Sequence, residues 1–157
     1  MSMPSTTETV NPELGIPSYL DVFEQVGGSG GHAELQGVLR RLVARARALR
    51  ELGPDWDSYG AAAPSATTLD FALLFAAQTC VFLVQGGLPL LEPFMVATRD
   101  GGIQLEWSDN SRHLEIEIPQ PGAFLILAVE RDQEDERPAT AEVAFRYVQW
   151  LATGQAV

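Results

Sequence analysis

Residues 94–129 read FMVATRDGGIQLEWSDNSRHLEIEIPQPGAFLILAV, and this stretch decides the fold. Apolar and polar residues alternate over residues 103–108 and again over residues 113–118. Alternation with a period of two is typical of strands that bury one face and expose the other to water. Residues 124–129 are apolar at nearly every position, which indicates a strand that is covered on both faces or borders another layer. We therefore predict a four-stranded antiparallel meander over about residues 93–130.

Two connections set the register of the first three strands. The Asp-Gly pair in the first connection favours a two-residue type I′ turn, because such a turn needs positive φ at both central residues. This turn pairs Val96 with Leu105 and Phe94 with Trp107. The second connection, Asp-Asn-Ser-Arg, pairs Trp107 with Leu114. A one-residue slip would expose the whole apolar set, so two turns that agree on one face predict that Trp107 is buried with Leu105 and Leu114.

The opposite face of these strands carries carboxylates. In this register Glu106 lies across from Glu115, and Glu117 lies across from Gln104. Like charges directly opposed on a sheet are unfavourable unless an arginine or a bound partner compensates. Two interpretations stay open: a solvated face on which salt screens the repulsion, or an acidic face that binds a partner. We keep Glu106, Glu115 and Glu117 as candidate partner-binding residues. A metal site is disfavoured, because it would hold carboxylates alone with no histidine near them in the register.

The composition is typical of one soluble globular domain and limits its partners. The chain has 157 residues, of which 46% are hydrophobic and 20% charged, so it is long enough for a sizeable core. The net charge of −11 disfavours nucleic acid, because phosphate binding needs a basic patch. The single Cys80 excludes an internal disulfide and fits a reducing compartment. The chain does not begin with a basic region followed by an apolar run, so we expect a cytoplasmic protein without a secretory signal.

The N-terminal part of the chain has a composition of its own. Residues 1–18 are rich in Ser, Thr, Pro and Glu, as is typical of disorder in isolation. Within residues 17–26, apolar side chains recur at helical spacing, at Tyr19, Leu20, Val22, Phe23 and Val26. About ten residues cannot hold a helix alone in water, so we predict a short amphipathic helix that docks on another element. We expect it to lie against the exposed side of the central or C-terminal helix, and we take Tyr19, Leu20 and Phe23 as candidate partner-binding residues.

A Gly/Ser stretch, GGSGG at residues 27–31, joins this segment to the rest of the chain. Two interpretations of the stretch stay open. It is a natural linker, or it is an added tether that joins a partner's binding peptide, residues 1–26, to a separate domain. In both cases we expect residues 32–157 to form a single α+β domain.

Two helices are predicted between the linker and the sheet, at about residues 32–52 and 66–85. The first has one apolar stripe, and five of the ten arginines of the chain lie on its remaining surface. They form a solvated face, or some of them pair with the acidic sheet or an acidic partner. The second begins after Ser65 as its N-cap and is apolar all round. We expect it to be a buried central helix rather than a membrane span, because polar residues interrupt its apolar run, and we expect Cys80 to be a core residue.

The chain ends in a predicted charged loop and helix. Residues 130–137 are nearly all charged, which indicates a loop. The helix is predicted at about residues 138–153, with Pro138 in its first turn. Its apolar arc is wide enough for contacts on two sides. One contact is with the core, and the other is with residues 19–26 or a second copy of the chain.

Two short elements resemble those of a known group of proteins. Residues 56–65 read WDSYGAAAPS, which fits W-D-x-x-G-x-x-x-P-S, and residues 100–107 read DGGIQLEW, which fits D-G-G-I-x-L-E-W. With the helix between them, these elements resemble a widespread group of small uncharacterised bacterial proteins, over roughly residues 49–117. The resemblance implies neither an activity nor catalytic residues, and residues 1–31 have no counterpart in it.

The first of these elements has a structural interpretation of its own. We expect Trp56 and Tyr59 to be core or boundary aromatics that fix the entry to the next helix. Asp57 is expected to accept hydrogen bonds from backbone N–H groups in the turn, as aspartates in turns do.

The sequence contains no catalytic signature and no recognisable nucleotide or metal motif, so we predict no catalytic residue, cofactor or metal. We predict a small acidic protein that acts by binding another protein, as antitoxins, immunity factors and subunit chaperones do, and this assignment rests on analogy. The partner is another protein or a peptide such as residues 17–26, and a homodimer is a further alternative. The second interpretation is a small-molecule-binding domain or hydrolase with a pocket between helices and sheet. Its candidate polar groups are Asp57, Glu106, His113 and Glu115.

Overall fold

The computed structural model describes residues 10–11, 16–17 and 31–157. The predicted helix at residues 17–26 and the glycine-rich linker lie almost wholly outside the described residues. The candidate residues Tyr19, Leu20 and Phe23 lie outside them as well. Two short strands, β1 (Val10–Asn11) and β2 (Ile16–Pro17), pair antiparallel.

The described part of the chain has an α+β fold with three helices and a five-stranded antiparallel sheet, which confirms the predicted class. The helices are α2 (Gly31–Arg50), α3 (Ala66–Gln85) and α4 (Ala141–Thr153). The strands are β3 (Phe94–Ala97), β4 (Ile103–Asp109), β5 (Arg112–Ile118), β6 (Phe124–Glu130) and β7 (Gln133–Ala139). They are hydrogen-bonded in chain order, so the sheet is a meander. The prediction of four strands was wrong, because β7 adds a fifth.

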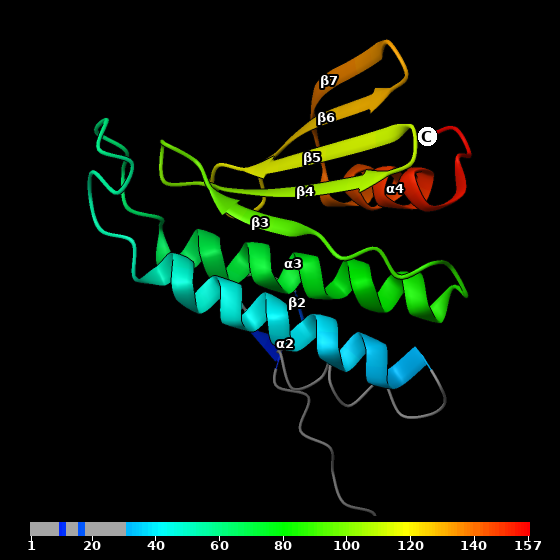
Figure 1. Cartoon of the computed structure of the whole chain (residues 1–157), viewed down its shortest axis with the longest axis horizontal. Coiled ribbons are helices and arrows are strands. Elements are labelled where there is room, and N and C mark those ends of the chain that lie inside the picture. Colours follow the sequence, from blue (N-terminus) through cyan, green and yellow to red (C-terminus); the bar gives the residue numbers. More distant parts are fainter. Residues whose placement is uncertain (1–9, 12–15, 18–30) are drawn as a thin grey trace, which may run out of the picture.

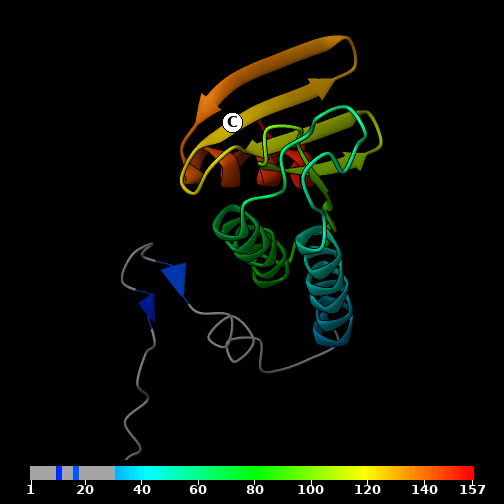
Figure 2. The same cartoon turned by 90° about the vertical axis from the view of Figure 1, so that its left-hand side faces the viewer.

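α3 and α4 lie on one side of the sheet, and α2 lies beyond its edge strand β3 (Figures 1 and 2). α4 packs against β4, β5 and β6, and α3 packs against β4. α2 lies alongside α3 and contacts the edge strand β3. The face that α3 and α4 cover is called the inner face below, and the opposite one the outer face. The largest side chains of the core are fully buried between these layers: Leu35, Leu69, Leu83, Met95, Ile103, Leu105, Leu114, Ile116, Ile118, Ile126 and Leu151.

The predicted register of β4 and β5 is confirmed. Trp107 pairs with Leu114, and Glu106 pairs with Glu115. Asn110, at φ 50°, lies in the two-residue turn that joins the strands. Trp107 is 3% exposed on the inner face, and its Nε1 donates a hydrogen bond of 3.3 Å to the carbonyl of Leu91.

The predicted register of β3 and β4 was wrong by one residue. The connection is a three-residue turn, in which Thr98 N–H donates to Gly102 O at 2.9 Å and Gly101 N–H donates to Thr98 O at 3.2 Å. Gly101 has a φ of 86°, as in the three-residue hairpin loops that end in a left-handed residue. Met95, rather than the predicted Val96, therefore pairs with Leu105. Met95 is 1% exposed, whereas Phe94 turns outward and is 57% exposed.

The predicted loop at residues 130–137 is instead mostly the edge strand β7. An edge strand needs a partner on one side only, so charged residues and a proline are compatible with it. Pro138 belongs to β7 and does not open α4. The helix begins after Thr140, whose Oγ1 accepts a hydrogen bond of 3.3 Å from the N–H of Val143.

The bounds of α3 agree with the prediction, and Ser65 is its N-cap: Ser65 Oγ accepts from the N–H of Thr68 at 3.4 Å. Cys80 is fully buried, as expected of a core residue. Burial raises the pKa of its thiol to about 12, so the thiol stays protonated at neutral pH. α3 is long and apolar enough to cross a membrane, a test that the core helix of a soluble protein also passes. Here 72% of the apolar 18-residue window of α3 that passes this test is buried inside the protein.

Candidate functional site

The outer face of the sheet is crossed by three rows of side chains. α3 and α4 lie on the other side of the sheet, and α2 lies beyond its β3 edge (Figure 2). The middle row consists of Phe94, Glu106, Glu115, Leu127 and Glu136. The rows beside it consist of Val96, Gln104, Glu117, Leu125 and Pro138, and of Ser108, His113, Val129 and Glu134.

A chain of hydrogen bonds links the polar residues of β4 and β5 on this face. The amide of Gln104 donates to Glu106 Oε1 at 2.9 Å and to Glu115 Oε2 at 3.2 Å. His113 Nε2 lies 2.8 Å from Glu115 Oε1, and His113 Nδ1 lies 2.8 Å from Ser108 Oγ. The opposed glutamates are therefore bridged by an amide, not by an arginine. The expectation that no histidine lies near these carboxylates was wrong, because His113 contacts Glu115.

The order serine, histidine, glutamate resembles the hydrogen-bonded groups of a serine hydrolase. Such chemistry also needs a concave site and donors for an oxyanion. Ser108, His113 and Glu115 lie in the middle of a sheet face and do not line the pocket described below. We interpret this series of hydrogen bonds as structural: it gives the polar side chains of the sheet face their hydrogen-bond partners.

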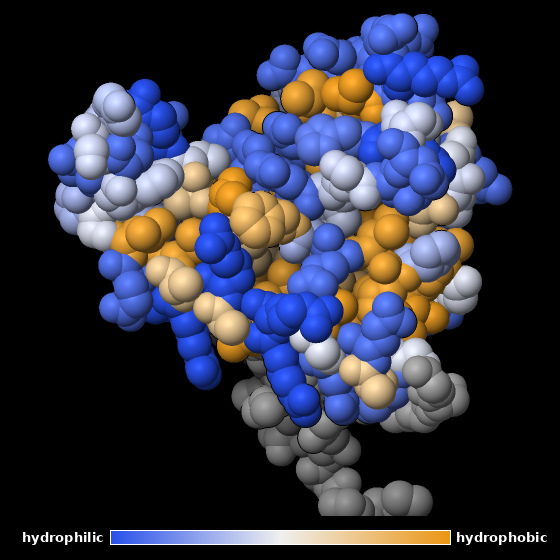
Figure 3. Space-filling model, in the orientation of Figure 1, coloured by the Kyte–Doolittle hydropathy of each residue, from blue (hydrophilic) through white to orange (hydrophobic). Residues whose placement is uncertain are grey.

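An apolar stripe runs along β6 on the outer face. It consists of Leu125, which is 43% exposed, and of Leu127 and Val129, which are half-buried. Glutamates border the stripe on both sides. They are Glu115 and Glu117 on β5, and Glu134 and Glu136 on β7. In Figure 3 this apolar band over β6 lies between hydrophilic bands over its two neighbours.

A pocket of about 300 Å³ lies where β6 and β7 extend past α4. It is lined in part by Asp135 and Arg137 of β7 and by Tyr147 and Trp150 of α4. Arg137 Nη2 lies 2.7 Å from Asp135 Oδ2, and the Tyr147 hydroxyl donates to the same carboxylate. The Tyr147 hydrogen bond links α4 to β7, and the Arg137 pair lies within β7.

Asp135 and Tyr147 of this pocket are not suited to acid–base catalysis at neutral pH. The Tyr147 hydroxyl and the Arg137 guanidinium lower the pKa of Asp135. Burial and the neighbouring Asp135 carboxylate raise the pKa of Tyr147. A general acid or base works best with a pKa near the operating pH, and both shifts move away from it. The pocket therefore does not favour the hydrolase interpretation.

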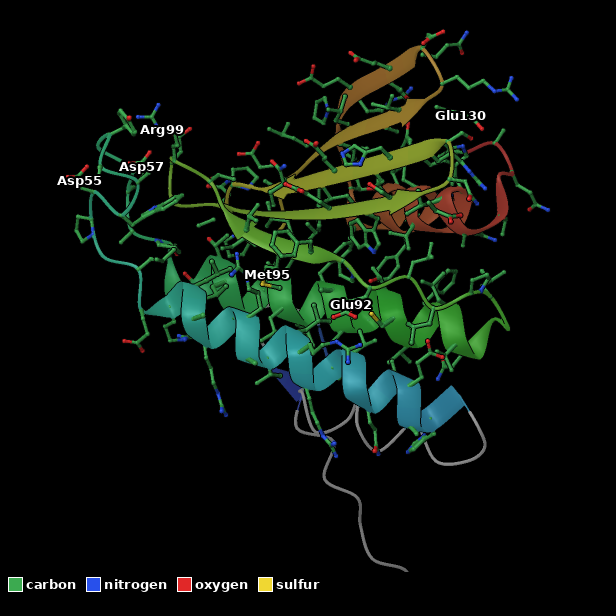
Figure 4. The ribbon with its side chains drawn as sticks, in the orientation of Figure 1. Asp55, Asp57, Glu92, Met95, Arg99 and Glu130 are labelled. Atoms are coloured by element: carbon green, nitrogen blue, oxygen red, sulfur yellow. The ribbon has the colours of Figure 1, made fainter. Side chains whose placement is uncertain are left out.

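The loop that contains Asp57 packs against the β3–β4 turn (Figure 4). Asp57 Oδ1 accepts from the N–H of Tyr59 at 2.8 Å and from the N–H of Ala61 at 3.0 Å, as predicted for a turn aspartate. Asp57 Oδ2 lies 3.1 Å from Arg99 Nε, and Arg99 Nη2 donates to Tyr59 O at 2.6 Å. Burial would raise the pKa of Asp57, but these backbone donors and Arg99 lower it overall. Tyr59 itself is 81% exposed, so the expectation of a core or boundary aromatic was wrong for this residue.

The two motif elements are therefore in contact with each other. Ser65 N–H donates to Gly101 O at 3.0 Å. A Cβ on Gly101 would lie 3.0 Å from Ala63 O, and one on Gly102 would lie 2.9 Å from Ile118 O. Both positions thus require glycine, because a backbone oxygen of another segment lies too close to leave room for a side chain. The geometry explains Gly101 and Asp57 as parts that join the loop to the hairpin, and Gly102 as a position where the chain lies against the end of β5.

The arginines of α2 do not reach the glutamates of the outer face. Arg41 makes a two-pronged ion pair with Glu92, with Nη2 to Oε2 at 2.8 Å. Arg45 Nε donates to Met95 O at 2.8 Å, and its guanidinium lies 5.0 Å from the centre of the Phe94 ring. Figure 4 shows Glu92 and Met95 where the approach to β3 passes α2 and α3. These arginines fix the edge strand β3 to α2.

The structure brings some predicted site residues together and adds others. Glu106, Glu115 and Glu117 lie on the outer face as predicted, whereas Asp57 lies at the far end of the molecule in its own loop. The apolar stripe and the glutamates of β7 were not predicted from the sequence. The apolar run at residues 124–129 held the signal, because alternate residues of a strand must face outward. The residues missed were Leu125, Leu127, Val129, Glu134 and Glu136.

The chain matches no family model, no curated protein and no solved structure to which it was compared. The likeness to the bacterial group therefore rests on its two motifs and stays a prediction. Among residues 31–157 and the two short strands, no three His, Cys, Asp or Glu side chains converge to hold a metal ion. The outer face is the candidate site that remains.

Proposed function

We propose that this protein acts by binding another protein through the outer face of its sheet. The observation that carries the proposal is the apolar stripe of Leu125, Leu127 and Val129, which no described helix covers. A sheet face with contiguous apolar side chains normally packs against another layer. A partner would supply that layer here. The proposal includes a cytoplasmic role of the antitoxin, immunity or subunit-chaperone kind.

The composition of the face supports a protein partner over a small ligand. Apolar groups at the centre with charged groups at the rim are typical of protein interfaces. Small-molecule sites are instead concave and bury most of the ligand. The stripe lies across an open sheet face, whereas the pocket beside α4 is lined mainly by residues of the inner face and of α4.

The proposal is tested by affinity capture from extracts of the source cell with the full chain as bait. We expect one protein to be retained by the wild type and lost, by at least about tenfold, with the double variant Leu125→Ser/Leu127→Ser. The matched control is Tyr59→Ser, which removes an exposed aromatic side chain far from the sheet face. Circular dichroism of all three proteins checks that each is folded.

Two results would overturn the proposal. One is a partner that the double variant retains as well as the wild type does. The other is that no protein is retained by the wild-type chain under conditions in which it is folded.

A further inference from the structure

The outer face carries charge of one sign. Its strand positions hold five glutamates and no arginine. Among the described residues, Glu117, Glu134 and Glu136 have no ion pair, while Glu106 and Glu115 share the amide of Gln104. Among the described residues, the cationic groups at this face are His113, when it is protonated, and Arg45, which lies over the ring of Phe94 at the β3 edge. The face therefore presents an apolar centre between two acidic columns, the glutamates of β5 and those of β7, and the β7 column has no ion pair among the described residues.

The spacing of these groups fits one α-helix laid along β6. Residues two apart on a strand are separated by about 6.7 Å, so the stripe from Leu125 to Val129 is about 13 Å long. On a helix, residues four apart rise by about 6 Å, which matches this repeat over two to three turns. β5 and β7 lie about 9.6 Å apart across β6, close to the width of a helix with its side chains. Long basic side chains on both flanks of such a helix would reach the glutamates on both sides.

The charge distribution excludes two other occupants of this face: a second copy of the protein, and the protein's own N-terminal segment. A second copy that docked by the same face would place glutamates opposite glutamates. The N-terminal segment, residues 1–30, contains Glu8, Glu13, Asp21 and Glu24 and no lysine or arginine. Neither complements the acidic columns. A basic segment of a different protein does.

We infer that the outer face binds a basic amphipathic helix of the partner protein, with apolar residues on the stripe and arginines or lysines against the glutamates of β5 and β7. This inference rests on the proposed function. The inference goes further than the proposed function because it names the chemistry of the partner segment.

The experiment titrates full-length protein with a synthetic helical peptide of about 18 residues, a length that holds helix better than a shorter one. The peptide carries leucines four residues apart and arginines on both flanks, and binding is followed by fluorescence of a dye on the peptide. A peptide with glutamates in place of the arginines is the control. We expect the basic peptide to bind, the acidic peptide not to bind, and the affinity to fall as salt is added.

Three variants decide where the peptide binds. Glu134→Gln/Glu136→Gln should weaken binding by about tenfold, and Leu127→Ser should weaken it similarly. Glu34→Gln/Glu51→Gln removes the same charge from Glu34 in the first turn of α2 and Glu51 just after its end, beyond the β3 edge of the sheet, and should leave binding unchanged.

Three outcomes would overturn the inference. Equal losses in the α2 variant and the β7 variant, or no loss with Leu127→Ser, would show general attraction to an acidic protein. A captured partner that depends on Leu125 and Leu127 but binds equally well to the Glu134→Gln/Glu136→Gln variant would sink the inference and leave the proposed function standing.

Discussion

The two faces of the sheet share the same strands but differ in what covers them. On the inner face, Leu105, Trp107 and Leu114 are at most 3% exposed beneath α3 and α4. On the outer face, Leu125 is 43% exposed between rows of glutamates. The inner face is complete as a core, whereas the outer face has an apolar centre that no described helix covers. Strand alternation thus shows which residues share a face, but not whether the chain itself covers that face.

The largest expected effect is on the inner face. Trp107→Ala should lower the free energy of unfolding by about 3–5 kcal/mol, because it leaves a cavity in the core. Leu125→Ala, on the outer face, should change it by less than about 1 kcal/mol. Urea denaturation of both variants measures the difference. Equal losses would contradict the distinction between the two faces.

The next prediction tests the register of β3, which decides on which face of the sheet Phe94 and Met95 each lie. Met95→Ala should lower the free energy of unfolding by about 2–5 kcal/mol, as for a buried side chain. Phe94→Ala should lower it by about 1 kcal/mol or less, mainly through the lost contact with Arg45. Chemical denaturation compares the two. A greater loss for Phe94 would favour the two-residue turn that the sequence predicts.

A smaller effect on stability is expected when the pH is lowered, and it comes from the carboxylate of Asp135 on the inner side of β7. Its pKa is lowered in the folded protein, so its contribution to stability is complete above the unfolded pKa of about 3.9 and is lost as the pH falls through the folded value. The stability difference between wild type and Asp135→Asn should therefore shrink as the pH falls below about 4. Thermal denaturation at a series of pH values measures it. Tyr147→Phe removes the hydroxyl donor, so Asp135→Asn should change the stability of the Tyr147→Phe protein less than that of the wild type. An effect of Asp135→Asn that does not depend on pH would refute this account.

The smallest effect is expected on the outer face. Glu106→Gln/Glu115→Gln removes two opposed charges, so the isolated protein should be at least as stable, by a few tenths of a kcal/mol. Added salt should abolish this gain by screening the repulsion in the wild type. Denaturation at low and high salt tests both points. A clear loss of stability would mean that the bridge from Gln104 to the two carboxylates outweighs their repulsion.

Short-range patterns were enough to predict several parts of the fold. The register of β4 and β5 follows from alternation and a two-residue turn, and both signals lie within sixteen residues of sequence. The bounds of α3 follow from its Ser65 cap and the glycines at its end. Asp57 was expected to accept backbone N–H groups from its sequence context and does so. In each case the deciding groups are close together in the chain.

Tertiary contacts decided the parts that the sequence did not. Asp-Gly is compatible with both a two-residue and a three-residue turn, and here Thr98 Oγ1 accepts from Gly102 N–H while Gly101 packs on the backbone of Ala63. The segment that forms β7 carries the charges of a loop and becomes a strand only because β6 offers a free edge. Which face of the sheet stays uncovered depends on where α3 and α4 pack. The sequence by itself determined local structure and the sorting of residues onto faces, because those depend on near neighbours along the chain. The exposed stripe depends on contacts between distant segments, so only the tertiary structure decided it.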